Sequence, residues 1–154
     1  MTKFWTILLL IAFSIPVLGQ RRANNVPSKE DQLNKKYCSP LFNTSHAEYI
    51  DLLHDNGTQS ARSYTNILDW LQGRVAGLQV YAGRNNTRIP YLRNQRAGIY
   101  VDEIWMDADY LSMLSVSDIG MVKIMKGPVM GPRSGPGGII AIYTIREEDL
   151  EEEE

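Results

Sequence analysis

The two histidines of the chain, His46 and His54, stand among carboxylates that could share a metal ion with them. Zinc-binding histidines on a helix usually lie about three to five residues apart and need a third ligand. The two histidines here are eight residues apart. The spacing therefore favours a solvated helix surface, and we predict no metal site. The neighbouring carboxylates are Glu48, Asp51 and Asp55.

Four further carboxylates are close enough in sequence to suggest acid–base catalysis, which needs paired acids whose pKa values are held apart. Turns and helix caps are ordinary positions for such residues and account for all four. We therefore predict no catalytic residues and no enzymatic activity. The four are Asp102, Glu103, Asp107 and Asp109.

A glycine- and proline-rich loop, GPVMGPRSGPGG at 127–138, could present backbone N–H groups to a phosphate. The phosphate-binding loop of nucleotide hydrolases continues through Gly-Lys-Ser/Thr into a helix. Here the loop leads into an apolar, strand-like run, and its prolines remove N–H donors. We predict no nucleotide and no other cofactor.

Cys38 is the single cysteine, so the chain has no internal disulfide framework. A tolerated thiol in a loose N-terminal segment and an intermolecular disulfide both remain open. A catalytic thiol is disfavoured because neither histidine belongs to a nucleophile motif. The sequence does not assign a role to Cys38.

Two apolar strands are predicted on either side of the Gly-Pro loop. In the first, Val122 and Ile124 point to one side of the pleat, and Met121 and Met125 point to the other. The second has the same two apolar faces, so we expect a strand covered on both sides. Its alternating residues are Ile139, Ala141, Tyr143 and Ile145 on one side and Ile140, Ile142 and Thr144 on the other.

Upstream, the pattern predicts short elements. We expect amphipathic helices over 47–54 and 66–76, the second ended by Gly77. We expect strands over 78–81, 88–93 and 97–101, a turn before 104–106, and a short helix capped by Asp107 or Asp109. Together these elements predict an α+β fold, with a mixed sheet of four to five strands and short helices.

Two stretches resemble a known family. The run from Asp118-Ile119 through Lys126-Gly127-Pro128 to Gly137-Gly138 and IIAIYT is similar to the closing part of the TonB-dependent receptor plug domain. NILDWLQGRVAGLQV at 66–80 is similar to the opening of that domain in the polysaccharide- and nutrient-receptor branch. The resemblance implies a plug-like fold over 66–146. The positions that match family motifs, as structural or contact positions, are Gly73, Gly77, Asp102, Asp118, Gly127, Gly137 and Gly138.

The chain departs from the family pattern at several places. Lys123 stands where the family commonly has Glu, Asp102-Glu103 where it has Asp-Gly, and Met130-Gly131 where an aromatic-Gly pair is usual. An Arg-Gly pair usual near 88–93 is missing. We expect Lys123 at an exposed position. No barrel-forming segment follows, so the resemblance implies a free-standing plug-like domain.

The resemblance implies a non-enzymatic domain that acts by protein or ligand contact beside an outer-membrane receptor or transport system. An outer-membrane receptor or barrel protein is the implied partner, and a small-molecule ligand is unidentified. The alternative is a soluble periplasmic ligand-binding module that reuses the plug scaffold. The sequence does not say which ligand or partner is bound, whether the domain gates transport, or what its oligomeric state is.

The two ends of the chain predict its location and organisation. Residues 1–19 have the layout of a signal peptide, with Lys3, an apolar run and a cut after Gly19. An uncleaved anchor is the alternative. We expect a flexible arm over 20–44, the plug-like domain over 45–146 and an acidic disordered tail over 147–154. The protein is thus predicted in the periplasm or at the periplasmic face of the outer membrane.

Charge excludes one class of partner. The chain has 16 basic and 18 acidic residues, and seven of the acidic ones lie in the last eight positions. The remaining arginines form no patch interleaved with aromatic residues, so we predict no nucleic-acid binding. A competing interpretation has the acidic tail docked on nearby arginines in an autoinhibitory pose. These are Arg84, Arg88, Arg93 and Arg96.

Overall fold

The computed structural model describes residues 27–44, 47–55, 58–128 and 134–151, and the side chains of these residues up to 149. The described chain forms a central mixed sheet of five strands and a smaller antiparallel sheet of three. The central order is β1 (Ala47–Asp51), β7 (Ile119–Lys126), β8 (Gly138–Thr144), β5 (Gly98–Val101) and β6 (Ile104–Met106), and the small sheet is β2 (Leu78–Ala82), β3 (Arg88–Leu92) and β4 (Gln95–Arg96).

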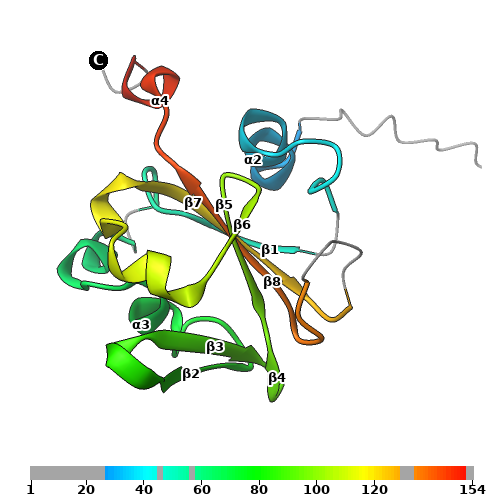
Figure 1. The fold of residues 1–154 in the computed structure, drawn as a ribbon. Coiled ribbons are helices and arrows are strands. Elements are labelled where there is room, and N and C mark those ends of the chain that lie inside the picture. Colours follow the sequence, from blue (N-terminus) through cyan, green and yellow to red (C-terminus); the bar gives the residue numbers. More distant parts are fainter. Residues whose placement is uncertain (1–26, 45–46, 56–57, 129–133, 152–154) are drawn as a thin grey trace, which may run out of the picture.

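Helices are short and lie around these sheets, which confirms the predicted α+β class (Figure 1). The expected signal peptide lies outside the described residues, as does Met130-Gly131. The α-helices are α2 (Lys29–Tyr37), α3 (Ile67–Leu71) and α4 (Glu147–Glu151), and the 3-10 helices are η1 (Gln59–Ser63), η2 (Arg84–Asn86), η3 (Ala108–Ser112) and η4 (Val116–Asp118).

The β7–β8 hairpin occupies the middle of the central sheet and is buried on both faces, as predicted. β8 pairs antiparallel with β7 and parallel with β5. One face, called the α3 face, presents four aliphatic side chains to α3 and the small sheet. The opposite face, called the arm face, packs against residues 33–42. The α3 face carries Val122, Ile124, Ile140 and Ile142, and the arm face carries Met121, Met125, Ile139, Ala141 and Tyr143.

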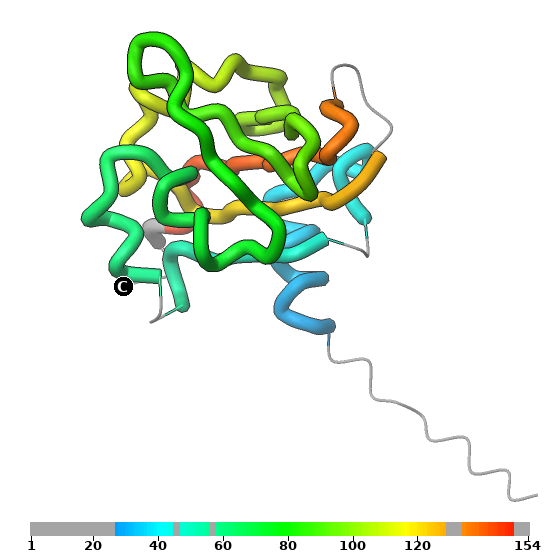
Figure 2. Tube along the Cα trace, turned by 90° about the horizontal axis from the view of Figure 1, so that it is seen from below, coloured from blue at the N-terminus to red at the C-terminus, as the bar shows by residue number. Residues whose placement is uncertain are grey.

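The small sheet and α2 lie on opposite sides of the central strands (Figure 1). Figure 2, seen from the side of the small sheet, shows the β2–β3 ribbon crossing over these strands. Leu78 and Leu92 of that ribbon belong to the same apolar core as α3. The predicted strands over 78–81, 88–93 and 97–101 are confirmed to within a residue or two, and residues 104–106, after the predicted turn, form a further strand.

The arm over 20–44 was expected to have little fixed structure, but its described part begins with a capped helix. The Asp31 N–H donates to Ser28 Oγ over 3.1 Å, and the Ser28 N–H donates to Asp31 Oδ2 over 3.2 Å. Each side chain thus satisfies an N–H at the start of α2. Leu33, Tyr37 and Phe42 are then buried against the sheet. This helix was not predicted because the segment is mostly polar. A few correctly spaced apolar residues are nevertheless enough to dock a short helix on the sheet.

The helix predicted over 47–54 is wrong: residues 47–51 form strand β1 instead. β1 pairs with β7 from Ala47 opposite Met125 to Asp51 opposite Met121. Apolar periodicity alone does not separate helix from strand in so short a segment. The edge of β7 supplies the backbone partners that decide between them. The other predicted helix, over 66–76, exists but ends at Leu71 rather than before Gly77.

Lys123 is buried, so the expectation of an exposed side chain is wrong. Its ammonium, 0% exposed, donates to Asn34 Oδ1 over 2.6 Å and to the carbonyl oxygen of Phe42. It also lies 4.9 Å from the centre of the Tyr49 ring. The β7 register places Lys123 on the arm face, and the arm then closes over it. A buried ammonium is tolerated when its donors are satisfied in this way.

The acidic tail also differs from expectation, because its first residues form helix α4. The Arg146 N–H donates to Asp149 Oδ2 over 2.7 Å, and Asp149 is 2% exposed. The Asp149 Oδ1 atom forms an ion pair of 2.7 Å with Lys36 Nζ at the end of α2. The described part of the tail therefore contacts the arm, not the arginines of the small sheet, and the autoinhibitory docking is not formed there.

Candidate functional site

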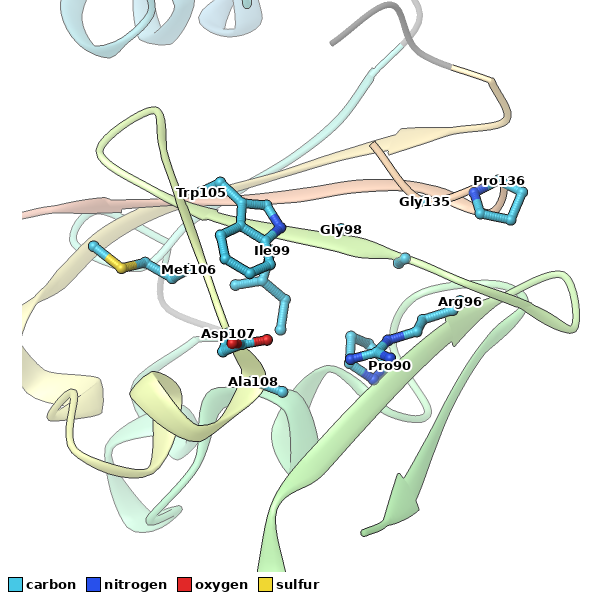
Figure 3. Close-up of a pocket in the computed structure, with 11 residues that line it drawn as sticks. Pro90, Arg96, Gly98, Ile99, Trp105, Met106, Asp107, Ala108, Gly135 and Pro136 are labelled. Atoms are coloured by element: carbon cyan, nitrogen blue, oxygen red, sulfur yellow. The ribbon is translucent and has the colours of Figure 1, made fainter. Parts of the chain in front are cut away.

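A cleft of about 270 Å³ lies where the Gly-Pro loop, the small sheet and the β5–β6 hairpin meet (Figure 3). Its walls combine proline rings and apolar side chains with one guanidinium and one carboxylate. The cleft is lined by Pro90, Arg96, Ala97, Gly98, Ile99, Trp105, Met106, Asp107, Ala108, Gly135 and Pro136.

The end of the Gly-Pro loop packs directly against β4. The Gly137 N–H donates to the Arg96 carbonyl over 3.2 Å. A Cβ on Gly137 would lie 2.2 Å from the Gln95 carbonyl oxygen, and one on Gly135 would lie 2.1 Å from the Arg96 carbonyl oxygen. Neither position can hold a side chain without moving the backbone. These glycines set the width of the cleft on the loop side.

The opposite wall depends on the tight turn that joins β5 to β6. Asp102 and Glu103 both have positive φ, at 47° and 68°, as a two-residue hairpin turn requires. The turn places Ile99 opposite Met106 and Tyr100 opposite Trp105. Ile99, Trp105 and Met106 then line the cleft. The family pattern has Gly where Glu103 stands, which agrees with the backbone conformation found here.

The polar groups of the cleft are one acid and one base. Asp107 precedes η3, but its side chain makes no capping hydrogen bond. The side chains of Asp107 and Arg96 are exposed, and among the described residues neither has a hydrogen-bond or ion-pair partner. Such a cleft can contact a peptide-like segment through both charges and its apolar walls. Among the described residues that line it, no nucleophile is paired with a base.

The remaining motif positions contribute backbone conformations or hydrogen bonds in three parts of the fold. Gly73 and Gly77 have φ of 109° and 79° in the connection from α3 to β2, and the Gly77 carbonyl accepts from the Arg93 N–H over 2.9 Å. At the far end of the sheet, Asp102 accepts from the Thr144 N–H over 2.9 Å, and the Asp118 carbonyl accepts from the Ile145 N–H over 2.9 Å.

The last two motif glycines close the base of the Gly-Pro loop. Gly127 and Gly138 have φ of 95° and 118°. The Gly127 N–H donates to the Gly137 carbonyl over 3.1 Å, and a Cβ on Gly138 would lie 2.1 Å from the Met125 carbonyl oxygen. Together with Gly137, three of the seven motif positions therefore build the loop that borders the cleft. Asp102 lies in the β5–β6 turn behind the opposite wall, and the other three lie in connections elsewhere.

The histidine and carboxylate groups singled out for metal chemistry are not assembled into a site. His46 lies outside the described residues, and within residues 27–44, 47–55, 58–128 and 134–151 no group of three possible ligands lies together. His54 Nδ1 contacts Asp51 Oδ2 at 3.2 Å. Burial of Asp51 acts to raise its pKa, but hydrogen bonds from the His54 and Leu53 N–H groups and from Lys29 outweigh it, so the pKa is lowered.

The four carboxylates considered for acid–base catalysis point to separate partners. Asp102 holds Thr144, Glu103 accepts from the Ser39 N–H over 2.6 Å, and Asp109 accepts from the Thr87 hydroxyl. Only Asp107 of the four lines the cleft. From its sequence context Asp107 is a possible helix cap. The cleft is not recognisable from the sequence, because its walls come from segments up to about 45 residues apart that only the sheet pairing brings together.

Cys38 lies at the junction of arm and sheet and is partly buried. Its Sγ atom is 3.7 Å from Lys123 Nζ. No helix in the described part of the chain is long and apolar enough to cross a membrane.

No protein-family model matches this chain, and no curated protein matches it. Among solved structures, it is similar to a chain of the RagAB peptide importer in its closed-closed state, with 18% identity and a TM-score of 0.49. That match covers 66% of this chain and 12% of the other. The open-open state of the same importer matches with 20% identity and a TM-score of 0.47, over 64% and 12% of the two chains. This chain thus spans a small fraction of the length of the structures it matches.

Proposed function

We propose that this chain is an exported, non-enzymatic, plug-like domain that acts by contact in association with an outer-membrane receptor or transport system. The proposal rests on the structural role of three glycines at positions that match the plug motifs. Gly127, Gly137 and Gly138 hold the Gly-Pro loop against β4, and so border a cleft with apolar walls and two charges that have no partner among the described residues.

That arrangement supports contact more than chemistry. The residues that match the plug motifs contribute backbone conformations and turn hydrogen bonds rather than reactive groups. Two of the side chains lining the cleft, the Trp105 indole and the Arg96 guanidinium, are of types enriched at protein–protein interfaces. A receptor loop or a peptide segment of the transport system would fit these groups.

The alternative is a soluble periplasmic module that binds a small ligand in the same cleft. The specific observation in its favour is that Arg96 and Asp107 both line a cleft of about 270 Å³. This volume is close to the lower limit of small-molecule sites, which begin at about 300 Å³. A small zwitterionic molecule would match the two charges.

Affinity purification of the tagged chain from detergent-solubilised membranes of the native host tests the proposal. We expect an outer-membrane protein to co-purify with the chain and to be lost from Asp107→Arg, because the charge in the cleft is reversed. Glu148→Arg makes the same charge change at an exposed site and should retain the partner. A chain found wholly in the periplasmic fraction, whose melting temperature is raised by a small ligand, would contradict the proposal and support the alternative.

A further inference from the structure

The outward side of the β2–β3 ribbon carries an apolar and aromatic strip. Leu78, Val80 and Leu92 point inward to the core, so the residues between them point away from it. Tyr81 and Tyr91 meet edge to face with ring centres 5.2 Å apart, and Tyr81 is 53% exposed. The strip, called the tyrosine face, consists of Gln79, Tyr81, Ile89 and Tyr91.

The segment that builds the tyrosine face is strongly basic. Residues 70–101 contain five arginines and no carboxylate. Two of the five are already engaged, because Arg74 stacks on Trp70 and Arg88 pairs with Asp69 at 2.8 Å. The other three have exposed side chains without a hydrogen-bond or ion-pair partner among the described residues. These are Arg84, Arg93 and Arg96.

Two of the free arginines mark the two ends of the tyrosine face. Arg84 lies in the turn that joins β2 to β3, and Arg93 lies in the turn that joins β3 to β4. A five-residue strand is about 16 Å long, which is the run of the ribbon between the turns. β2 is also an edge strand of the small sheet within the described residues, so its outer backbone groups face away from the sheet.

We propose that the tyrosine face binds an extended acidic segment of a partner protein. Two carboxylates about five residues apart would reach Arg84 and Arg93, and uncharged side chains between them would pack on Tyr81 and Tyr91. Tyrosine and arginine are the residues that most often dominate binding energy at protein interfaces. That the partner belongs to a transport system rests on the contact function proposed above. Its extended, acidic character is inferred from the tyrosine face alone.

The acidic tail of the same chain does not meet this description in its described part. α4 contacts the end of α2, at the opposite end of the molecule from β2 and β3 (Figure 1). Aromatic rings flanked by arginines also occur in sites for single-stranded nucleic acid, where bases stack on the rings, so single-stranded DNA is a competing occupant in the test below. Duplex nucleic acids and anionic lipids are less well matched, because the free arginines are few and are separated along the ribbon. They do not form a continuous basic groove or an amphipathic helix.

Fluorescence anisotropy with the purified chain tests this proposal directly. The probe is a labelled, end-blocked hexapeptide with Glu at positions one and six and uncharged β-branched residues between. We expect saturable binding that weakens with salt, about tenfold loss in Tyr81→Ala/Tyr91→Ala, and about two- to fivefold loss in Arg84→Gln or Arg93→Asn. Arg62→Gln, an exposed arginine of η1, should bind as the unaltered chain does. Unchanged thermal melting confirms that each variant is folded.

Several results would overturn the proposal. They are no saturable binding, equal binding of a peptide whose two Glu residues are adjacent, and equal losses in Arg62→Gln. Tighter binding to single-stranded DNA, to phosphatidylglycerol vesicles or to a peptide of residues 147–154 would assign the face to another occupant. Because this assay uses no membrane partner, its failure leaves the co-purification test of the contact function unaffected.

Discussion

The two faces of the central β7–β8 hairpin are both buried, but they are built differently. The α3 face is aliphatic and is covered by segments from the middle of the chain. The arm face is rich in Met and Tyr, contains the buried Lys123, and is covered by α2 and the residues that follow it. The first is an ordinary apolar core, whereas the second is a polar-centred contact closed by one short N-terminal segment.

The difference shows which part of the fold depends most on contacts between residues that are distant in the sequence. The α3 face is held by many elements, so losing one side chain leaves the rest in place. The arm face depends on Leu33, Tyr37 and Phe42, and on hydrogen bonds that Lys123 makes to the arm. Arg146 adds to this contact by donating to the carbonyl oxygens of Lys36 and Tyr37 at the end of α2.

Deleting the arm should have the largest effect. A chain that begins at Thr44 loses three buried side chains and exposes the arm face of the sheet. At about 2 kcal/mol for each large apolar side chain, the loss of roughly 5 kcal/mol or more is comparable with the whole stability of a small domain. Urea unfolding followed by circular dichroism checks this. A deleted chain with an unchanged midpoint would mean that the arm is not part of the fold.

Truncating the aliphatic side chains of the α3 face should have the next largest effect. Ile140 and Ile142 are fully buried, and replacing either with Ala should lower the free energy of unfolding by about 2–4 kcal/mol, since each leaves a cavity. Urea midpoints of the two variants measure the loss. Ile104→Ala, on a 61% exposed strand position, is the matched control and should stay within about 0.5 kcal/mol of the unaltered chain. Equal losses in all three would contradict the assigned core.

Substitutions at Lys123 test the difference between the two faces most directly. Lys123→Ala should cost about 2–3 kcal/mol, because it leaves a cavity and two buried acceptors unsatisfied. Lys123→Met leaves the same two acceptors unsatisfied but fills most of the cavity, so it should be less destabilising than Lys123→Ala by about 1–2 kcal/mol. The comparison of the two unfolding midpoints is the measurement. If Met were as harmful as Ala, the hydrogen bonds to Asn34 and Phe42 would matter more than packing.

Acid should weaken the arm contacts by a smaller amount. Burial acts to raise the pKa of Asp51 and of Asp149, but hydrogen bonds and the lysine partners outweigh it, so both pKa values are lowered in the folded chain. Their contribution is complete above the unfolded pKa of about 3.9 and is lost as the pH falls through the lower folded pKa. Asp51→Asn should reduce the fall in melting temperature between pH 6 and pH 3 by about 3 °C.

The control for this pH effect is Asp55→Asn, which removes an exposed carboxylate beside the same lysine, Lys29. It should leave the fall in melting temperature nearly unchanged. If Asp55→Asn and Asp51→Asn had equal effects, the buried environment of Asp51 would not be the cause.

The contrast between the faces also explains what the sequence could predict. Alternation in 119–126 and 138–144 identified both faces of the hairpin, because strand periodicity is a local property. The motif glycines located the turns for the same reason. The burial of Lys123, the docking of α2 and the strand at 47–51 depend on pairing across 70 residues or more. No local pattern carries that information.

The same distinction between local patterns and long-range pairing applies to the candidate site. Gly137 and Asp107 were each recognised by residue type, one as a motif glycine and the other as a possible cap. That Asp107 lines a cleft with Arg96 and Trp105, and that Gly137 bonds to β4 beside it, follows from the long-range pairing, which places β5 beside β8 and β4 beneath the loop.

Photo-cross-linking in the native host tests most directly whether the chain works by contact through the cleft. A photoreactive amino acid replaces Asp107 in one variant and Leu41, which is 76% exposed on the arm, in another. We expect a discrete adduct with an outer-membrane protein from position 107 and none from position 41. An adduct of equal yield from both positions, or none in the membrane fraction from position 107, would contradict this expectation.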